Sequence, residues 1–161
     1  MYIDGLMIGR ALHVLGVVLW IGGVAMETTV LLPAMRRTND PKERVAWFKK
    51  VERGFAWQAR VTTLLVGLTG LYMVFEMDAW SRFGRVDQWW LHAMVFVWIV
   101  FSVVLFILEP LVLHRWFDRR AAKDPDGTFS LIQRLHWILL AVSLATVAAA
   151  VAGAHGGVLF G

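Results

Sequence analysis

Four long runs of apolar residues alternate with short polar stretches along the chain. The runs cover residues 6–32, 55–77, 89–113 and 131–152. A helix needs about 20 residues to cross the hydrocarbon core of a bilayer, and each run reaches that length. The pattern therefore predicts an all-α integral membrane protein with a single four-span domain. Because the connections between runs are short, we expect an antiparallel four-helix bundle.

The three polar connections differ in charge. Most of the 16 Lys and Arg residues lie in the first connection, residues 36–54, and the third, residues 114–130. Positive charge accumulates on the cytoplasmic side of membrane proteins. We therefore expect both basic connections to face the cytoplasm of a bacterial-type inner (plasma) membrane. Both chain termini then lie outside, an N-out/C-out topology.

Turn-forming residues lie inside both basic connections, at residues 39–41 and 124–127, and predict chain reversals there. Residues 42–53 favour a short amphipathic helix on the cytoplasmic surface. The side chains expected to face lipid are Val45, Phe48 and Val51. The first apolar run has no small-residue cleavage site at its end, so we expect it to be retained as a span.

Composition supports the membrane assignment and removes several classes of site. Hydrophobic residues make up 58% of the 161 positions, with nine Trp and ten Phe against two Tyr. The chain has no Cys, which excludes disulfides, thiolate ligands, iron–sulfur clusters and covalently attached c-type haem. The net charge of +4 follows from the loop charges, so the expected partner is the lipid bilayer and no nucleic acid. Motifs of phosphate-binding loops, dinucleotide sites and hydrolases are missing.

Small and polar residues share one face of each predicted span, at steps of three and four residues. In the first span that face carries His13, Gly16, Trp20, Gly23 and Glu27. The corresponding residues are Arg60, Thr63, Gly67, Gly70 and Val74 in the second span, His92, Phe96, Ile99, Val103, Phe106 and Pro110 in the third, and His136, Leu140, Ser143, Val147 and Ala150 in the fourth. We expect these faces to point into the bundle. Gly16 has two interpretations: close helix packing, or room for a flat macrocycle beside His13.

A layer of ionisable residues is expected toward the cytoplasmic side of the bundle. It comprises Glu27, Arg60 and Glu109, with His136 at a similar depth. Unpaired charges are costly within a membrane, so Arg60 is expected to pair with Glu27 or with Glu109. The layer is interpreted either as a structural ion pair or as a proton path.

The five histidines fall at two depths. His13, His92 and His155 are predicted at the outer level, and His114 and His136 at the inner level. Histidine is costly inside a bilayer and is the commonest nitrogen ligand of metals. His13, His92 and His136 are the candidate metal ligands. For His114 the alternative is a headgroup-facing side chain, and for His155 a simple helix end.

Neutral imidazoles on facing helices suit b-type haem, which needs no covalent attachment. We expect one haem at the outer level, held by His13 and His92. A second haem at the inner level, using His136 and His114, would make the bundle a transmembrane electron-transfer protein. A quinone or another small redox partner would then exchange electrons with it. Copper remains an alternative, because histidine and methionine are acceptable copper ligands.

Two stretches resemble known membrane families. Residues 11–23, ALHVLGVVLWIGG, resemble the first helix of the copper-resistance D-like proteins and of the small bacterial membrane protoporphyrinogen oxidases. Residues 90–93, WLHA, resemble the third-helix motif of those oxidases, in which a functional Lys follows; here Met94 occupies that position. Residues 51–53 are loosely similar to a basic segment before their second helix. The resemblance implies a haem b protein with His13 and His92 as the ligand positions, and leaves a porphyrinogen oxidase as an alternative.

Overall fold

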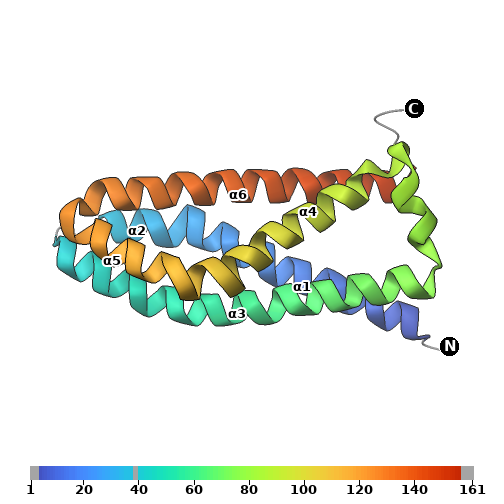
Figure 1. Cartoon of the computed structure of the whole chain (residues 1–161), viewed down its shortest axis with the longest axis horizontal. Helices are drawn as coiled ribbons and strands as arrows, with labels where there is room; N and C mark the ends of the chain where they lie inside the picture. Colours follow the sequence, from blue (N-terminus) through green and yellow to red (C-terminus); the bar gives the residue numbers. More distant parts are fainter. Residues whose placement is uncertain (1–3, 38–39, 157–161) are drawn as a thin grey trace.

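Four helical stretches run lengthwise beside one another in the computed structural model, which describes residues 4–37 and 40–156 (Figure 1). The stretches Gly5–Arg36, Glu43–Glu76, Val86–Lys123 and Pro125–Ala154 are long and apolar enough to cross a membrane. This confirms the expected four spans in length and composition. Both ends of the chain lie at one end of the molecule, here called the terminal end; the other is the distal end.

The first two stretches are joined at the distal end. Helix α1 (Gly5–Met26) continues through a π-helical segment, η1 (Glu27–Leu31), into α2 (Leu32–Arg36). Helix α3 (Pro41–Glu76) then returns to the terminal end without interruption. The turn predicted at residues 39–41 falls partly outside the described residues.

The last two stretches are also joined at the distal end. Short 3₁₀ segments, η2 (Ala79–Gly84) and η3 (Val86–Gln88), lead into α4 (Trp89–Val103). A ten-residue π-helical segment, η4 (Val104–Leu113), continues into α5 (His114–Lys123), and α6 (Pro125–Ala154) completes the bundle.

The prediction that residues 114–130 form a loop between two spans is wrong, because almost all of them are helical. Only Asp124 separates α5 from α6, and its side chain accepts a 2.9 Å hydrogen bond from the backbone of Gly127. An Asp at the N-cap followed by Pro is a helix start as well as a turn signal. The sequence signal was therefore located correctly, but it marks a helix boundary.

Two separate hydrophobic cores stabilise the bundle. The main core consists of Trp20, Ile21, Val24, Val66, Val97, Phe101 and Leu140. The distal core consists of Leu32, Met35, Phe48, Phe117, Ala121, Phe129 and Ile132. Elsewhere many apolar side chains are exposed, including Val18 (60%) and Leu68 (67%), which is consistent with contact with lipid.

The prediction of an amphipathic helix over residues 42–53 is right about the helix but wrong about its surroundings, which are protein and not the membrane surface. This segment is helical, but it is the first part of α3. Phe48 is buried in the distal core, where its ring centroid lies 5.0 Å from that of Phe117, and Val45 and Val51 pack against the same core. The apolar face therefore meets protein because α5 and the start of α6 supply a partner surface.

The predicted inward faces of the first and fourth spans are confirmed. Gly16 and Trp20 are buried along α1 and Glu27 at the start of η1, and Leu140 and Ser143 are buried along α6. A Cβ at Gly16 would lie 2.9 Å from a methyl carbon of Val66, so this glycine allows α1 and α3 to approach closely. Packing is thus the role that the structure gives Gly16.

The predicted inward face of the third span is wrong. Phe96 and Ile99 are 63% and 47% exposed, whereas Trp90, Val97 and Phe101 are buried. Helix α4 is apolar on every side, so residue spacing carries no information about which face is covered.

The orientation of α4 is set by large side chains packed against glycines. A Cβ at Gly153 would clash with the indole of Trp90, and a Cβ at Gly67 would lie 2.6 Å from the indole of Trp98. The two indoles therefore occupy the space beside glycines on α6 and α3. This packing leaves His92 on the exposed side of α4.

Candidate functional site

His13 lies between α1 and α3, near the terminal end. Its Nδ1 is 3.0 Å from Oγ1 of Thr69. The single hydroxyl proton of Thr69 is directed at the carbonyl oxygen of Leu65, 2.6 Å away, so Oγ1 accepts from His13. The proton of the neutral ring is thereby fixed on Nδ1, and the lone pair remains on Nε2.

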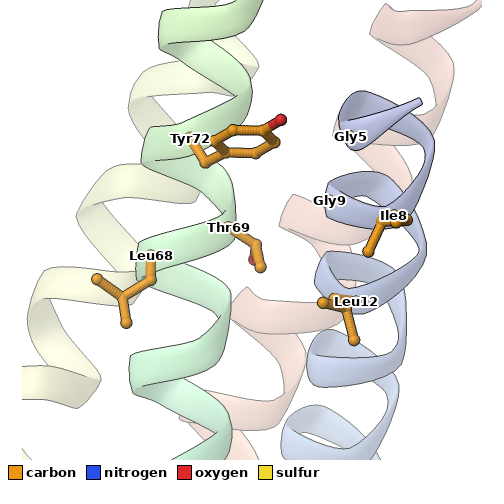
Figure 2. A pocket seen from close by; sticks show the side chains of 7 residues that line it. All are labelled: Gly5, Ile8, Gly9, Leu12, Leu68, Thr69 and Tyr72. Atoms are coloured by element: carbon orange, nitrogen blue, oxygen red, sulfur yellow. The ribbon is translucent and has the colours of Figure 1, made fainter.

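An open groove of about 350 Å³ lies between α1 and α3, and Thr69 is the member of this pair that lines it (Figure 2). It is lined by Gly5, Ile8, Gly9, Leu12, Leu68, Thr69 and Tyr72. The lining is apolar apart from the hydroxyl groups of Thr69 and Tyr72. A Cβ at Gly9 would lie 2.8 Å from the ring of Tyr72, and one at Gly70 would lie 3.2 Å from Cε1 of His13. The glycines therefore make room for both rings.

The other two histidines predicted at the outer level do lie toward the terminal end, but they are separate from His13. His92 is exposed, and its ring centroid lies 5.7 Å from that of Phe83 in an edge-on arrangement. His155 follows the last turn of α6, with Nδ1 2.8 Å from the carbonyl oxygen of Val151. Within residues 4–37 and 40–156, no hydrogen bond or ring contact joins these three imidazoles.

Six ionisable residues gather between the two cores and are here called the distal polar cluster. They are Glu27, Glu52, Arg60, Glu109, His114 and His136. Arg60 forms an ion pair with Oε2 of Glu109, and its Nε donates to the carbonyl oxygen of Leu105 at 3.1 Å. Of the two partners expected for Arg60, the structure selects Glu109.

His136 is held against Glu27 inside this cluster. Its Nδ1 lies 2.9 Å from the carbonyl oxygen of Ile132, which can only accept, so Nδ1 carries the proton. Nε2 lies 3.5 Å from Oε2 of Glu27, whose exposed fraction is 5%. A lone pair on Nε2 would face a carboxylate oxygen, which is stable only with a cation between them.

His114 belongs to the same cluster through Glu109. Its Nδ1 donates to the backbone carbonyl of Glu109 at 2.9 Å and lies 3.6 Å from Oε1 of that residue. Each of the two inner histidines thus has a glutamate as its neighbour, and in the described part of the chain no hydrogen bond or ring contact joins them to each other. The inner pair expected for a second haem is therefore not assembled as two facing imidazoles.

Glu52 is the member of the cluster that sequence reasoning missed as a site residue. One ligand atom each from Glu52, Glu109 and His114 lie within 4.8 Å of one another. Glu52 also interacts electrostatically with Glu27, Arg60 and His136. Glu52 lies eight residues before Arg60, which puts both residues on one face of a helix. This spacing could have indicated Glu52 only if the helix had been predicted to begin at Pro41.

Both buried glutamates lie in π-helical segments. Glu27 is the first residue of η1, and Glu109 lies within η4 directly before Pro110. Proline has no N–H to donate to the α-helical ladder, which favours the altered hydrogen bonding there. In η1 the hydroxyl of Thr28 donates to the carbonyl oxygen of Val24 at 2.6 Å. Such segments change the direction of side chains and are frequent at functional sites.

Comparison with protein-family models, with curated proteins and with solved structures found no match for this chain. The functional proposals below therefore depend on the geometry of its own residues.

Proposed function

We propose that the chain is a multi-pass protein of a bacterial-type inner membrane, folded as an antiparallel four-helix bundle with both termini outside. The basic residues of α5 and of the first part of α3 lie at the distal end, which the positive-inside rule places in the cytoplasm. The exposed apolar side chains along the remaining length would face lipid.

Single cysteines test this orientation, because the chain has none of its own. Ser81 lies in η2 at the terminal end and Ala122 in α5 at the distal end, and both are exposed. A membrane-impermeant maleimide should label Ser81→Cys in intact cells and Ala122→Cys only after permeabilisation. Labelling in the opposite order would overturn the orientation.

The proposed activity is redox chemistry by a haem b bound through His13. One observation carries this proposal: the hydrogen bond with Thr69 fixes the proton on Nδ1 and leaves Nε2 available. Ligating histidines are oriented in this way by the partner of their other ring nitrogen. The adjoining apolar groove suits a macrocycle that is not covalently attached.

His13 is the residue that would hold such a haem. His92 is exposed on α4 and makes no hydrogen bond or ring contact with His13, so we do not assign it to the same site. A bound haem would supply one-electron exchange at the terminal end. The partner we propose is a quinol or another small redox species at the membrane surface.

Absorption spectra of the detergent-purified protein, produced with haem available, test the proposal. The oxidised protein should show a Soret band, and reduction by a water-soluble quinol should produce an α-band. His13→Ala should remove both bands, whereas His155→Ala, an exposed histidine at the same end, should keep them. Bands that persist in His13→Ala would overturn the proposal, as would copper without porphyrin in a metal analysis of the wild type.

A further inference from the structure

The distal polar cluster contains a set of ligand atoms that the haem proposal does not use. We propose that Glu52, Glu109 and His114 bind one divalent transition-metal ion. One ligand atom from each lies within 4.8 Å of the others, contributed by α3, η4 and the start of α5. The site is separate from His13, which lies toward the opposite end of the bundle.

The spacing of these atoms is close to what a metal requires. Bonds of about 2.1 Å in a tetrahedral site separate neighbouring ligand atoms by about 3.4 Å. Side-chain movements on the order of 1 Å would close the present spacing to that distance. Glu52 is half-buried and the side chain of His114 is 52% exposed, so both have room to move. Three protein ligands leave a fourth position for water.

One of the three ligands is already oriented by another bond. Arg60 holds Oε2 of Glu109, which leaves Oε1 on the side of His114, 3.6 Å from its Nδ1. Nδ1 is the nitrogen of His114 on this side, and it also lies 2.9 Å from the backbone carbonyl oxygen of Glu109. To bind the ion, Nδ1 would release that hydrogen bond, and the ring would carry its proton on Nε2 instead. The bond from Arg60 to Glu109, made outward from a ligand, is typical of metal sites.

Charge balance in the cluster favours a cation. The three carboxylates of Glu27, Glu52 and Glu109 face one guanidinium, that of Arg60, and two imidazoles. With one proton shared between Glu27 and His136 and a neutral His114, one negative charge remains among these described residues. Glu27 and Glu109 are 5% and 8% exposed, and uncompensated buried charge is costly. One divalent ion would more than compensate this charge; one further bound proton is the competing explanation.

The donor set indicates which ions are suitable. Two carboxylates and one imidazole favour ions such as Mn²⁺, Fe²⁺ or Zn²⁺, and the set lacks the thiolate or thioether ligands that select Cu⁺. The partly exposed side of His114, at the beginning of the charged helix α5, provides an entry path from the distal end.

Titration calorimetry with Zn²⁺, on detergent-purified protein stripped with a chelator, tests the site directly. Co²⁺ serves as an optical probe, since its visible absorption reports the coordination. The variants are Glu52→Gln and His114→Gln, which alter side chains with access to solvent and are compatible with folding. Asp118→Asn is the matched control, because Asp118 is an exposed carboxylate on α5 that pairs with Lys49.

We expect one Zn²⁺ per chain, an affinity at least tenfold lower in Glu52→Gln and His114→Gln, and an unchanged affinity in Asp118→Asn. The absence of saturable Zn²⁺ binding would overturn the proposal and favour bound protons. Equal affinity in the wild type and in both ligand variants would also overturn it. Calorimetry does not depend on the Soret band, so failure here is distinguishable from failure of the haem proposal.

Discussion

Replacing Arg60 with methionine removes the cation from the ion pair that links α3 to η4. The substitution keeps a long, flexible side chain but leaves the carboxylate of Glu109 unpaired where only 8% of that residue is exposed. It also removes the donor to the carbonyl oxygen of Leu105.

The expected loss follows from burial. Removing one member of a buried ion pair costs about 3–5 kcal/mol, because the other charge stays buried alone. The side chain of Arg60 is 29% exposed and that of Glu109 11%, so water relieves part of this cost. We therefore expect a decrease of about 3 kcal/mol in the free energy of unfolding. In the double variant Arg60→Met/Glu109→Leu both members of the ion pair are removed, so no carboxylate of Glu109 is left behind, and the loss should fall to about 1 kcal/mol.

Denaturation by sodium dodecyl sulfate in mixed micelles, followed by circular dichroism with a chelator present, measures these differences. Lys49→Met is the control, since it breaks an ion pair in which both side chains are about half exposed and should cost no more than about 1 kcal/mol. If Arg60→Met is no more harmful than this control, or if the double variant is as unstable as the single one, the reasoning is refuted.

Three further predictions concern local features of the bundle, and each is tested by substitution. Thr69→Val removes the acceptor of the histidine proton and should lower haem affinity about 10- to 100-fold in a haem titration, whereas Thr69→Ser should restore it. Gly67→Ala puts a methyl group 2.6 Å from the indole of Trp98 and should cost about 1–3 kcal/mol in the same unfolding assay. Gly22→Ala, which meets nothing within 4 Å, should be neutral or stabilising. Asp124→Ala removes the N-cap of α6 and should cost about 0.5–2 kcal/mol, with a lower midpoint of thermal unfolding.

The four spans could be predicted from the sequence because membrane helices are defined by length and apolar composition, both of which are local properties. The inward faces of α1 and α6 were also predictable, since few polar residues, such as His13 and Ser143, lie within their apolar stretches and mark one side. The face of α4 was not, because it is set by the contacts of Trp90 and Trp98 with glycines on other helices. Such contacts leave no periodic signal within α4 itself.

The candidate site was predictable to the extent that its members lie in apolar sequence. His13 and the pairing of Arg60 with one of two glutamates stand out there, because each is expensive to bury. Glu52 does not stand out in the sequence, because it lies among charged residues that were interpreted as a segment on the membrane surface. Only the distal core shows that this segment is part of α3, and that core requires helices from both halves of the chain.

The two cores differ in the solvent that surrounds them, lipid for the main core and water for the distal core. With the bundle in a bilayer, the main core is surrounded by lipid tails, which are as apolar as its own side chains, so packing alone favours it. The distal core is formed by helical segments rich in charged residues and is assembled by the expulsion of water. That driving force weakens on cooling. Low temperature should therefore loosen the distal end while the environment of His13 stays intact. The carboxylates of the distal polar cluster lie at the boundary between the two cores.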